Sequence, residues 1–294
     1  MAEPNFLEKT ANFLRPVLPR RFRGNIPVVP VVRLSGVIGL SSPLRPGLTL
    51  ANVAKPLERA FAYPRARAVA LLINSPGGSA VQSHLVFQRI RQLAKEKDRP
   101  VIAFVEDVAA SGGYMIACAA DEIVADSSSI VGSIGVIGAT FGFSKLIEKI
   151  GVERRIYTSG TNKAMLDPFL PENPDHVARL KAIQEDIHAT FIDLVKSRRG
   201  ARLTAPEAEL FSGEYWAGKK GIEYGLVDRI GDLRSTLRER FGDKVQTPLI
   251  SAARGFFGRT PQGVGIERML DQPGLADVFV SALEARAIWA RYGL

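Results

Sequence analysis

The sequence predicts an α/β protein whose mostly parallel sheet is buried on both faces. Short, nearly continuous apolar runs rich in β-branched residues recur along the chain, as is typical of strands covered on both sides. A stretch with helical periodicity separates two of these runs, and the order strand, helix, strand favours right-handed parallel crossovers. The chain has 294 residues, 46% of them apolar and 23% charged, which is enough for a full hydrophobic core.

Four apolar runs are the expected strands, at 27–34, 68–73, 101–105 and 122–125. Between the second and third, apolar residues recur every three or four positions over 79–97, which predicts an amphipathic helix. A second helix is predicted over 174–199, because Asn173 or Asp175 can cap its first turn and Gly200 follows its last. A short helix is expected over 205–211.

We expect three parts in the chain: an N-terminal segment at 1–27, one folded domain at 28–244, and a tail at 245–294 with a candidate last helix at 274–292. The first segment is basic and amphipathic, with four arginines between residues 15 and 23. Two interpretations of it stay open, a short anchor for anionic lipid and a frayed terminus. No signal peptide and no membrane span are expected, because the chain lacks a long, strongly apolar run.

Lysine and arginine exceed aspartate and glutamate by a net charge of +9. This excess is spread along the chain, so a solvated basic surface and contact with an anionic membrane both stay open. Nucleic acid is not an expected partner, because stacking aromatics do not alternate with the basic residues. The single cysteine, Cys118, excludes a disulfide framework and a cysteine-based zinc site. We therefore expect a cytoplasmic protein, peripheral at most to the membrane.

Glycine-rich turns follow several of the predicted strands, at 74–78, 108–114, 131–136 and 159–164. A helix that begins directly after a strand leaves its first backbone amides unpaired, and such amides can hold an anion or an oxyanion. No dinucleotide or P-loop pattern is present, so no cofactor is expected, and no metal-binding pattern is present either. The three histidines, His84, His176 and His188, lack a local catalytic motif and are predicted to be surface residues.

Five stretches in order resemble the signal peptide peptidase A (SppA) family of serine proteases over about residues 31–231. They are Asn74-Ser-Pro-Gly-Gly78, Ala110-Ser-Gly-Gly-Tyr114, Val131-Gly-Ser-Ile-Gly-Val136, Lys163 before Asp167-Pro-Phe169, and Gly225-Leu-Val-Asp-Arg-Ile-Gly231. The resemblance implies a ClpP/crotonase-like fold of stacked strand–strand–helix units. It also implies a Ser/Lys dyad in which Ser111 is the nucleophile, Lys163 the general base, and Ser133 the residue that orients the lysine. The domain at 28–244 is then a Ser/Lys peptidase domain.

The chemistry of such a dyad sets conditions on its surroundings. A lysine acts as a base only when neutral, and lowering its pKa from about 10.4 to ~7.5 costs roughly 4 kcal/mol, which burial against apolar side chains supplies. The amides of Gly78 and Gly112 are the expected oxyanion hole, and Gly77 and Gly113 are expected in the substrate groove. The base motif departs from the family pattern, which more often has an aromatic residue before the lysine and small residues after it.

We therefore expect a serine endopeptidase that cleaves apolar peptides, such as signal peptide remnants or membrane-protein fragments, through an acyl-enzyme. The resemblance also implies a homo-oligomer whose grooves are built from neighbouring subunits. Two alternatives stay open. One is a crotonase-type acyl-CoA enzyme on the same fold, and the other is a non-enzymatic module at the membrane surface that uses residues 1–27.

Overall fold

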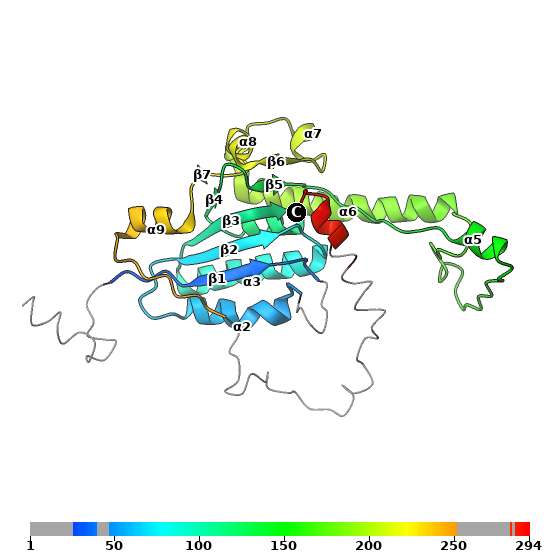
Figure 1. The fold of residues 1–294 in the computed structure, drawn as a ribbon, viewed down its shortest axis with the longest axis horizontal. Helices are drawn as coiled ribbons and strands as arrows, with labels where there is room; N and C mark the ends of the chain where they lie inside the picture. The colour runs from blue at the N-terminus through cyan, green and yellow to red at the C-terminus, as the bar shows by residue number, and fades with distance from the viewer. Residues whose placement is uncertain (1–25, 40–46, 252–282, 284–285) are drawn as a thin grey trace, which may run out of the picture.

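A seven-stranded sheet forms the centre of the molecule. The computed structural model describes residues 26–39, 47–251, 283 and 286–294. The strand order is β1-β2-β3-β4-β7, while β5 pairs with β3, and β6 with β5 (Figure 1). Only the β5–β6 pair is antiparallel among these strands. The predicted α/β class and the buried, mostly parallel sheet are confirmed. The strands are β1 (Val31–Ser35), β2 (Val69–Ser75), β3 (Val101–Ala110), β4 (Glu122–Ala125), β5 (Ile130–Gly132), β6 (Tyr215–Ala217) and β7 (Arg229–Ile230).

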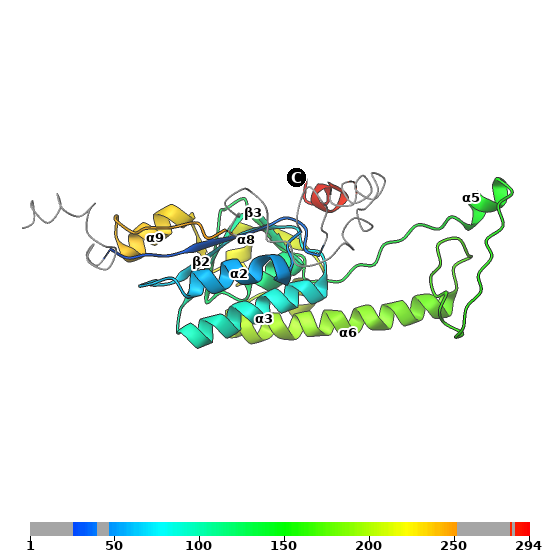
Figure 2. The same ribbon diagram turned by 90° about the horizontal axis from the view of Figure 1, so that it is seen from below.

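Helices cover both faces of the sheet (Figure 2). The larger core joins alternate residues of β1, β2 and β3 to α2, α3, α4 and α6. A smaller core on the opposite face joins the intervening strand residues to α9. This two-sided burial explains why the strands are apolar at nearly every position. The helices are α2 (Leu50–Phe61), α3 (Ala80–Lys97), α4 (Gly112–Ala117), α5 (Ser144–Lys149), α6 (Pro174–Arg199), α7 (Glu207–Leu210), α8 (Gly218–Glu223) and α9 (Leu233–Phe241).

The predicted helices at 79–97 and 174–199 are confirmed by α3 and α6, with Ser79 and Asn173 as their caps. Helices α2 and α9 were not predicted. Pro56 lies inside α2, and a proline within a helix argues against predicting one there. The buried side chains of Val53 and Leu57 pack this helix against the core. Helix α9 is polar apart from a narrow face around buried Leu237, so its stability depends on packing and on the Asp232 cap rather than on periodicity.

An arm leaves the sheet after β5 and returns through α6. Residues 137–173 carry α5 at the far end of the arm, and the N-terminal half of α6 forms its return (Figures 1 and 2). With 26 residues, α6 is long enough to reach from the sheet core to the arm. Its last turns are buried at Phe191 and Leu194, whereas Ile183 is 43% exposed. The predicted apolar stripe of this helix is therefore buried only near its C-terminal end.

The segment after α9 returns to the sheet and pairs with the start of the domain. The amides of Val29 and Val31 donate to the carbonyls of Gln246 and Pro248, at 2.8 and 2.9 Å. The predicted N-terminal segment lies outside the described residues except for 26 and 27, as does most of the predicted tail. In the candidate helix at 274–292, residues 286–290 are helical. None of the helices among the described residues is long and apolar enough to cross a bilayer.

Candidate active site

Strand register brings the glycine-rich turns to one edge of the sheet. In the parallel β3–β5 pair Ala110 lies opposite Gly132, and in the β2–β3 pair Ser75 lies opposite Ala109. Ser111 and Ser133 each come one residue after such partners, so they lie side by side where the strands end. The Ser111 amide donates to the Gly132 carbonyl at 2.8 Å. The carboxyl ends of parallel strands are the usual place for a site in this class of sheet.

Ser111 occupies a sharp turn between β3 and α4. Its backbone has φ 51° and ψ −122°, a conformation that L-residues adopt only under constraint from their surroundings. The turn presents its half-buried side chain to a cavity of about 770 Å³. Its Oγ has no hydrogen-bond partner within the described part of the chain. A serine on a strained strand-to-helix turn is a recurring arrangement for a nucleophile.

The amides predicted for an oxyanion hole flank this serine. Gly78 and Gly112 line the same cavity as Ser111, one from the turn after β2 and the other from the first position of α4. Neither amide donates a backbone hydrogen bond among the described residues. Unpaired amides beside a nucleophile can stabilise the charge of a tetrahedral intermediate.

Gly77 and Gly113 do not line the cavity; they allow backbones to approach closely beneath it. A Cβ on Gly77 would lie 2.8 Å from the Ser111 Cβ, and one on Gly113 would lie 2.4 Å from the Ser75 carbonyl oxygen. Both glycines are buried. Their geometry accounts for the glycines through packing around Ser111, and their part in a substrate groove stays a prediction.

Ser133 lines the cavity next to Ser111 and is 6% exposed. Its φ of 51° is also in the left-handed region, and its amide donates to the Glu214 carbonyl at 2.6 Å. The turn is therefore held by the segment that leads into β6. This fixed position suits a residue that orients another side chain in the site.

Lys163 is not part of the cavity of its own chain. It is exposed and lies in the segment between α5 and α6, which sits at the far end of the arm (Figures 1 and 2). Its ammonium group makes no hydrogen bond or ion pair to any described residue. The structure thus brings together six of the seven predicted site residues, the two serines and the four glycines, but leaves the predicted base, Lys163, apart from them.

Among the cavity residues that were not predicted as functional, His188 and Tyr292 have polar side chains close to the predicted site. His188 of α6 was predicted to be a surface residue, yet it lines the cavity with its Nε2 at 3.0 Å from the Ile134 carbonyl oxygen. Tyr292 also lines it and is 8% exposed. His188 lies within the apolar stripe of α6, between Ile187 and Phe191, and this was the one sequence feature that indicated a place away from the surface. Tyr292 comes from a distant part of the chain, and no sequence feature indicated its place at the cavity.

Other reactive groups of the described residues lie elsewhere. Cys118 is buried in the main core, and burial raises the pKa of its thiol to about 12, so the reactive thiolate is suppressed. No cluster of three or more histidine, cysteine or acidic side chains among these residues is arranged to hold a metal ion. Ser111 is therefore the best-placed nucleophile at the cavity.

A strained serine, unpaired amides and a cavity at the carboxyl ends of parallel strands are features that serine hydrolases on α/β folds also have. The family model for peptidase family S49 matches residues 93–244. The chain belongs to this family of SppA-type serine proteases.

Known proteins resemble the chain over different spans. It is 54% identical to a Brucella abortus protein named Na(+)/H(+) antiporter NhaA, over 96% of the chain but 39% of that protein. It is 37% identical to the chloroplastic serine protease SPPA of Arabidopsis thaliana, over 57% of the chain and 24% of that protein. The chain thus spans well under half of either relative. A solved mutant of a membrane-bound stomatin-specific protease aligns with a TM-score of 0.43 and 20% identity, over 73% of the chain and 84% of that structure.

Proposed function

We propose that the chain is a serine endopeptidase that works through an acyl-enzyme on Ser111. The Ser111 Oγ attacks the carbonyl carbon of the peptide bond and passes its proton to the neutral amine of Lys163. The amides of Gly78 and Gly112 hold the resulting oxyanion. The C–N bond then breaks, the leaving amine takes the proton from the lysine, and water releases the acyl group by the same steps.

The observation that carries this proposal is the convergence on one cavity of Ser111, Ser133 and the unpaired amides of Gly78 and Gly112. These groups come from three turns, with Ser111 and Gly112 on the same one, and the parallel register sets the three turns at the same edge of the sheet. A crotonase-type enzyme would use the same amides for a thioester oxyanion but would not need a strained serine between them. The φ of Ser111 therefore favours the peptidase over that alternative.

Lys163 is proposed to act on the cavity of a neighbouring copy of the chain. Within one chain it lies on the arm, away from the cavity, so the dyad is incomplete without a second copy. The arm also carries large apolar side chains that are exposed to solvent, including Phe141 at 77%, Ile150 at 63% and Tyr157 at 91% exposure. Apolar surface of this extent is typical of contact regions. A homo-oligomer that buries the arms would place the base beside Ser133.

Apolar peptides are the proposed substrates. Besides the serines, His188, Arg291 and Tyr292, the residues that line the cavity are apolar or glycine; they include Met115, Val136, Ile137, Ile187 and Phe191. A chain in extended conformation can lie between the turn after β2 and the turn after β5, with one apolar side chain in the cavity. Remnants of signal peptides or fragments of membrane proteins have this character.

The catalytic assignment is tested with Ser111→Ala and Lys163→Ala. Each variant should lower the cleavage of a fluorogenic apolar peptide at least about a thousandfold, because the nucleophile or its base is lost. Lys149→Ala, on the same arm, is the matched control and should retain activity. Full turnover in either dyad variant contradicts the mechanism. Affinity for coenzyme A without cleavage of peptides would support the crotonase-type alternative.

Mixing the two inactive variants tests whether the dyad spans two copies. Unfolding and refolding Ser111→Ala and Lys163→Ala together in equal amounts creates sites with an intact serine from one copy and an intact lysine from the other. Random assembly should restore about one quarter of the wild-type activity. A mixture as inactive as its components, at an unchanged assembly size, would show that the lysine acts within its own chain.

A further inference from the structure

The end of the described chain lies against the candidate active site. Residues 286–290 form a helical turn beside the carboxyl ends of β2 and β3 (Figure 1), on the side of the sheet away from α3 (Figure 2). Ile288, Arg291 and Tyr292 line the same cavity as Ser111. Residues 286–294, here called the closing segment, therefore form part of the cavity wall.

Apolar packing holds the closing segment in place. Trp289 and Tyr292 pack with Val108, Ala110 and Ile130, at the ends of the two strands that lead to Ser111 and Ser133. The Tyr215 hydroxyl donates to the Arg291 carbonyl at 3.1 Å, and the rings of Tyr215 and Tyr292 meet edge to face at 5.0 Å. The segment thus docks on β3, β5 and β6 together.

The Tyr292 hydroxyl reaches both walls of the cleft. It lies 3.3 Å from the Ser133 Oγ and 3.4 Å from the Pro76 carbonyl oxygen. Pro76 belongs to the turn after β2, and Ser133 to the turn after β5. A phenol group therefore spans the gap that an extended substrate would have to cross, and it contacts the serine that would orient the catalytic amine.

We propose that the closing segment is an internal occupant of the active site, and that its docking and the arrival of the lysine at Ser133 exclude one another. This inference rests on the proposed function, because it takes Ser133 as the partner of Lys163. Tyr292 then stands where the lysine amine would form its hydrogen bond. A chain with the segment docked is a closed form of the enzyme.

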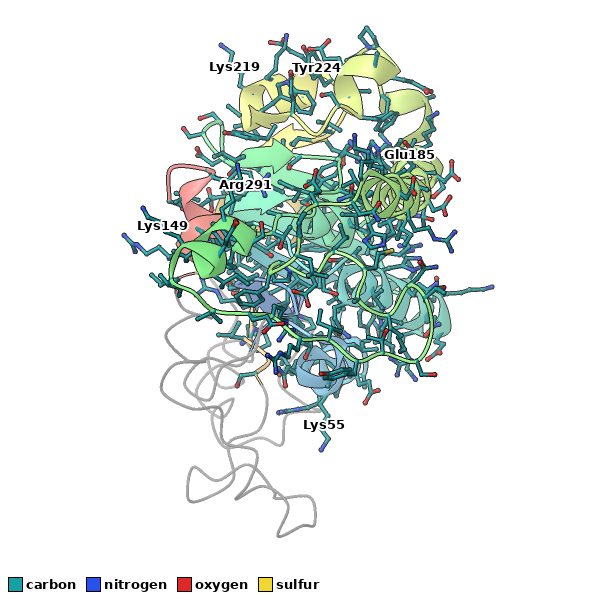
Figure 3. All side chains as sticks on the ribbon, turned by 90° about the vertical axis from the view of Figure 1, so that its right-hand side faces the viewer. Lys55, Lys149, Glu185, Lys219, Tyr224 and Arg291 are labelled. Atoms are coloured by element: carbon teal, nitrogen blue, oxygen red, sulfur yellow. The ribbon has the colours of Figure 1, made fainter. Side chains whose placement is uncertain are left out.

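The burial of Ser133 and Tyr292 and the charge of Arg291 both support the proposal that the docked segment and the lysine exclude one another at Ser133. Ser133 is 6% exposed and Tyr292 8%, so the Ser133 hydroxyl can be approached from few directions and the phenol takes one of them. Arg291 lines the cavity as well, and its guanidinium repels a lysine that approaches as an ammonium. Figure 3 shows Arg291 near the middle of the molecule and Lys149 of α5 toward its edge. Release of the segment would remove both obstacles at once.

Hydrogen exchange in the full chain measures the docking without relying on activity. The amides of Tyr292 and Gly293 donate within the segment, at 2.9 and 3.1 Å, and should exchange slowly while it is docked. Lys163→Ala removes the competitor, so exchange across 286–294 should slow several-fold relative to wild type. Lys149→Ala is the matched control and should leave it unchanged. Equal exchange in wild type and Lys163→Ala, or an unprotected segment in Lys163→Ala, overturns the proposal.

A second variant tests the same competition from the other side. Tyr292→Phe keeps the ring in its apolar contacts but removes the hydroxyl, so exchange over 286–294 should rise and peptide turnover should increase roughly two- to tenfold, as expected for one lost hydrogen bond. Tyr63→Phe, at a tyrosine that packs against the main core and does not line the cavity, should change neither. A fall in the turnover of Tyr292→Phe would overturn the proposal, since the phenol would then assist catalysis. If no variant cleaves peptides but the exchange responds as expected, the proposed function fails and the docking competition stands.

Discussion

Two serines with φ near +51° stand at the end of adjacent strands, and the surrounding fold keeps both of them in this conformation. Such a backbone costs about 1–3 kcal/mol per residue when the side chain is not glycine. The register of β3 and β5 holds Ser111, and the contact with Glu214 holds Ser133. The conformational cost is therefore concentrated at the cavity, as is common where a side chain must point into a site.

Gly78 is a position where alanine should damage both stability and the site. Its φ is +139°, and an added Cβ would lie 2.2 Å from the Ile38 carbonyl oxygen. Gly78→Ala should lower the free energy of unfolding by about 2 kcal/mol or more, measured by urea denaturation. Gly142→Ala is the control, because a Cβ there meets nothing within 4 Å. Equal unfolding midpoints for both variants would contradict the steric argument.

Arg199 and Asp228 form a two-point ion pair near the start of β4, with N–O distances of 2.7 and 2.9 Å. Burial alone would raise the pKa of Asp228, but hydrogen bonds from Arg199 and from the Ile123 amide outweigh it, and the pKa is lowered. A lowered folded pKa means that this carboxylate stabilises the fold above its unfolded pKa, and that the stabilisation is lost as the pH falls through the folded value.

Asp228→Asn should therefore destabilise the chain at pH 7 by about 3 kcal/mol, because Arg199 would stay buried without its counter-charge. The difference between wild type and Asp228→Asn should shrink as the pH falls below about 4, where the unfolded aspartate takes up a proton. Thermal unfolding at several pH values measures both effects. Glu153→Gln, in the exposed pair with Arg155, should leave the thermal unfolding midpoint close to that of wild type.

At the scale of elements, the long strand β3 changes partners halfway along its length. Its first half pairs with β4 through Ile102 to Val105, and its last residues pair with β5 through Val108 to Ala110. Between these regions the ladder is interrupted, and the Ser129 hydroxyl lies 3.2 Å from the Val105 carbonyl oxygen and 2.5 Å from that of Glu106. This fork lets β5 approach Ser111 while β4 continues the main sheet.

Ser129→Ala should weaken the fork, because the hydroxyl that donates to the Glu106 carbonyl and accepts from the Asp126 amide at 3.0 Å would be lost. Ser129 is 2% exposed, so water cannot readily replace it. The expected loss is about 1–3 kcal/mol in chemical denaturation, with faster hydrogen exchange in β5. The neighbouring Ser128→Ala, at an exposed position, should stay close to wild type. Unchanged exchange in β5 would show that Ser129 does not support the fork.

The parts of the fold that depend on local pattern were predictable, and those that depend on distant contacts were not. The four buried runs are nearly continuous in apolar residues, and the helices α3 and α6 have apolar residues at helical spacing. Helix α2 has Pro56 in its interior and escaped prediction. At the site, Ser111 and Ser133 each directly follow a strand, and each has a glycine as a chain neighbour. The cavity position of Tyr292 depends on packing across more than half the chain, and a sequence carries no sign of that.

At the scale of the whole molecule, the arm separates the predicted base from the predicted nucleophile. The arm is amphipathic rather than strongly charged, and the basic surface is spread widely. Figure 3 shows Lys55, Lys149 and Lys219 pointing outward from three different helices. This distribution favours a general solvated surface over a single basic patch. Contacts between copies should therefore depend on the apolar side chains of the arm.

Ile150→Asp should reduce the mass of the assembly in light scattering, because a charge would have to be buried where an apolar side chain is expected to pack. Peptide turnover should fall with the mass if Lys163 comes from a neighbour. Leu249→Asp is the control, at a residue that is 61% exposed but lies beside β1 and away from the arm. An unchanged mass together with full activity would contradict the role of the arm.

The pairing of residues 246–250 with the start of the domain has a consequence for how copies can meet. An open sheet edge would offer its amides and carbonyls to the strand of another molecule. Here the outer side of β1 is already covered by the chain's own returning segment, and β7 at the opposite edge has two residues. Growth of the sheet from one molecule into the next is therefore blocked along these edges. The homo-oligomer proposed above would therefore form by side-chain packing of the arm, which can close into a finite ring, rather than by sheet extension at these two edges.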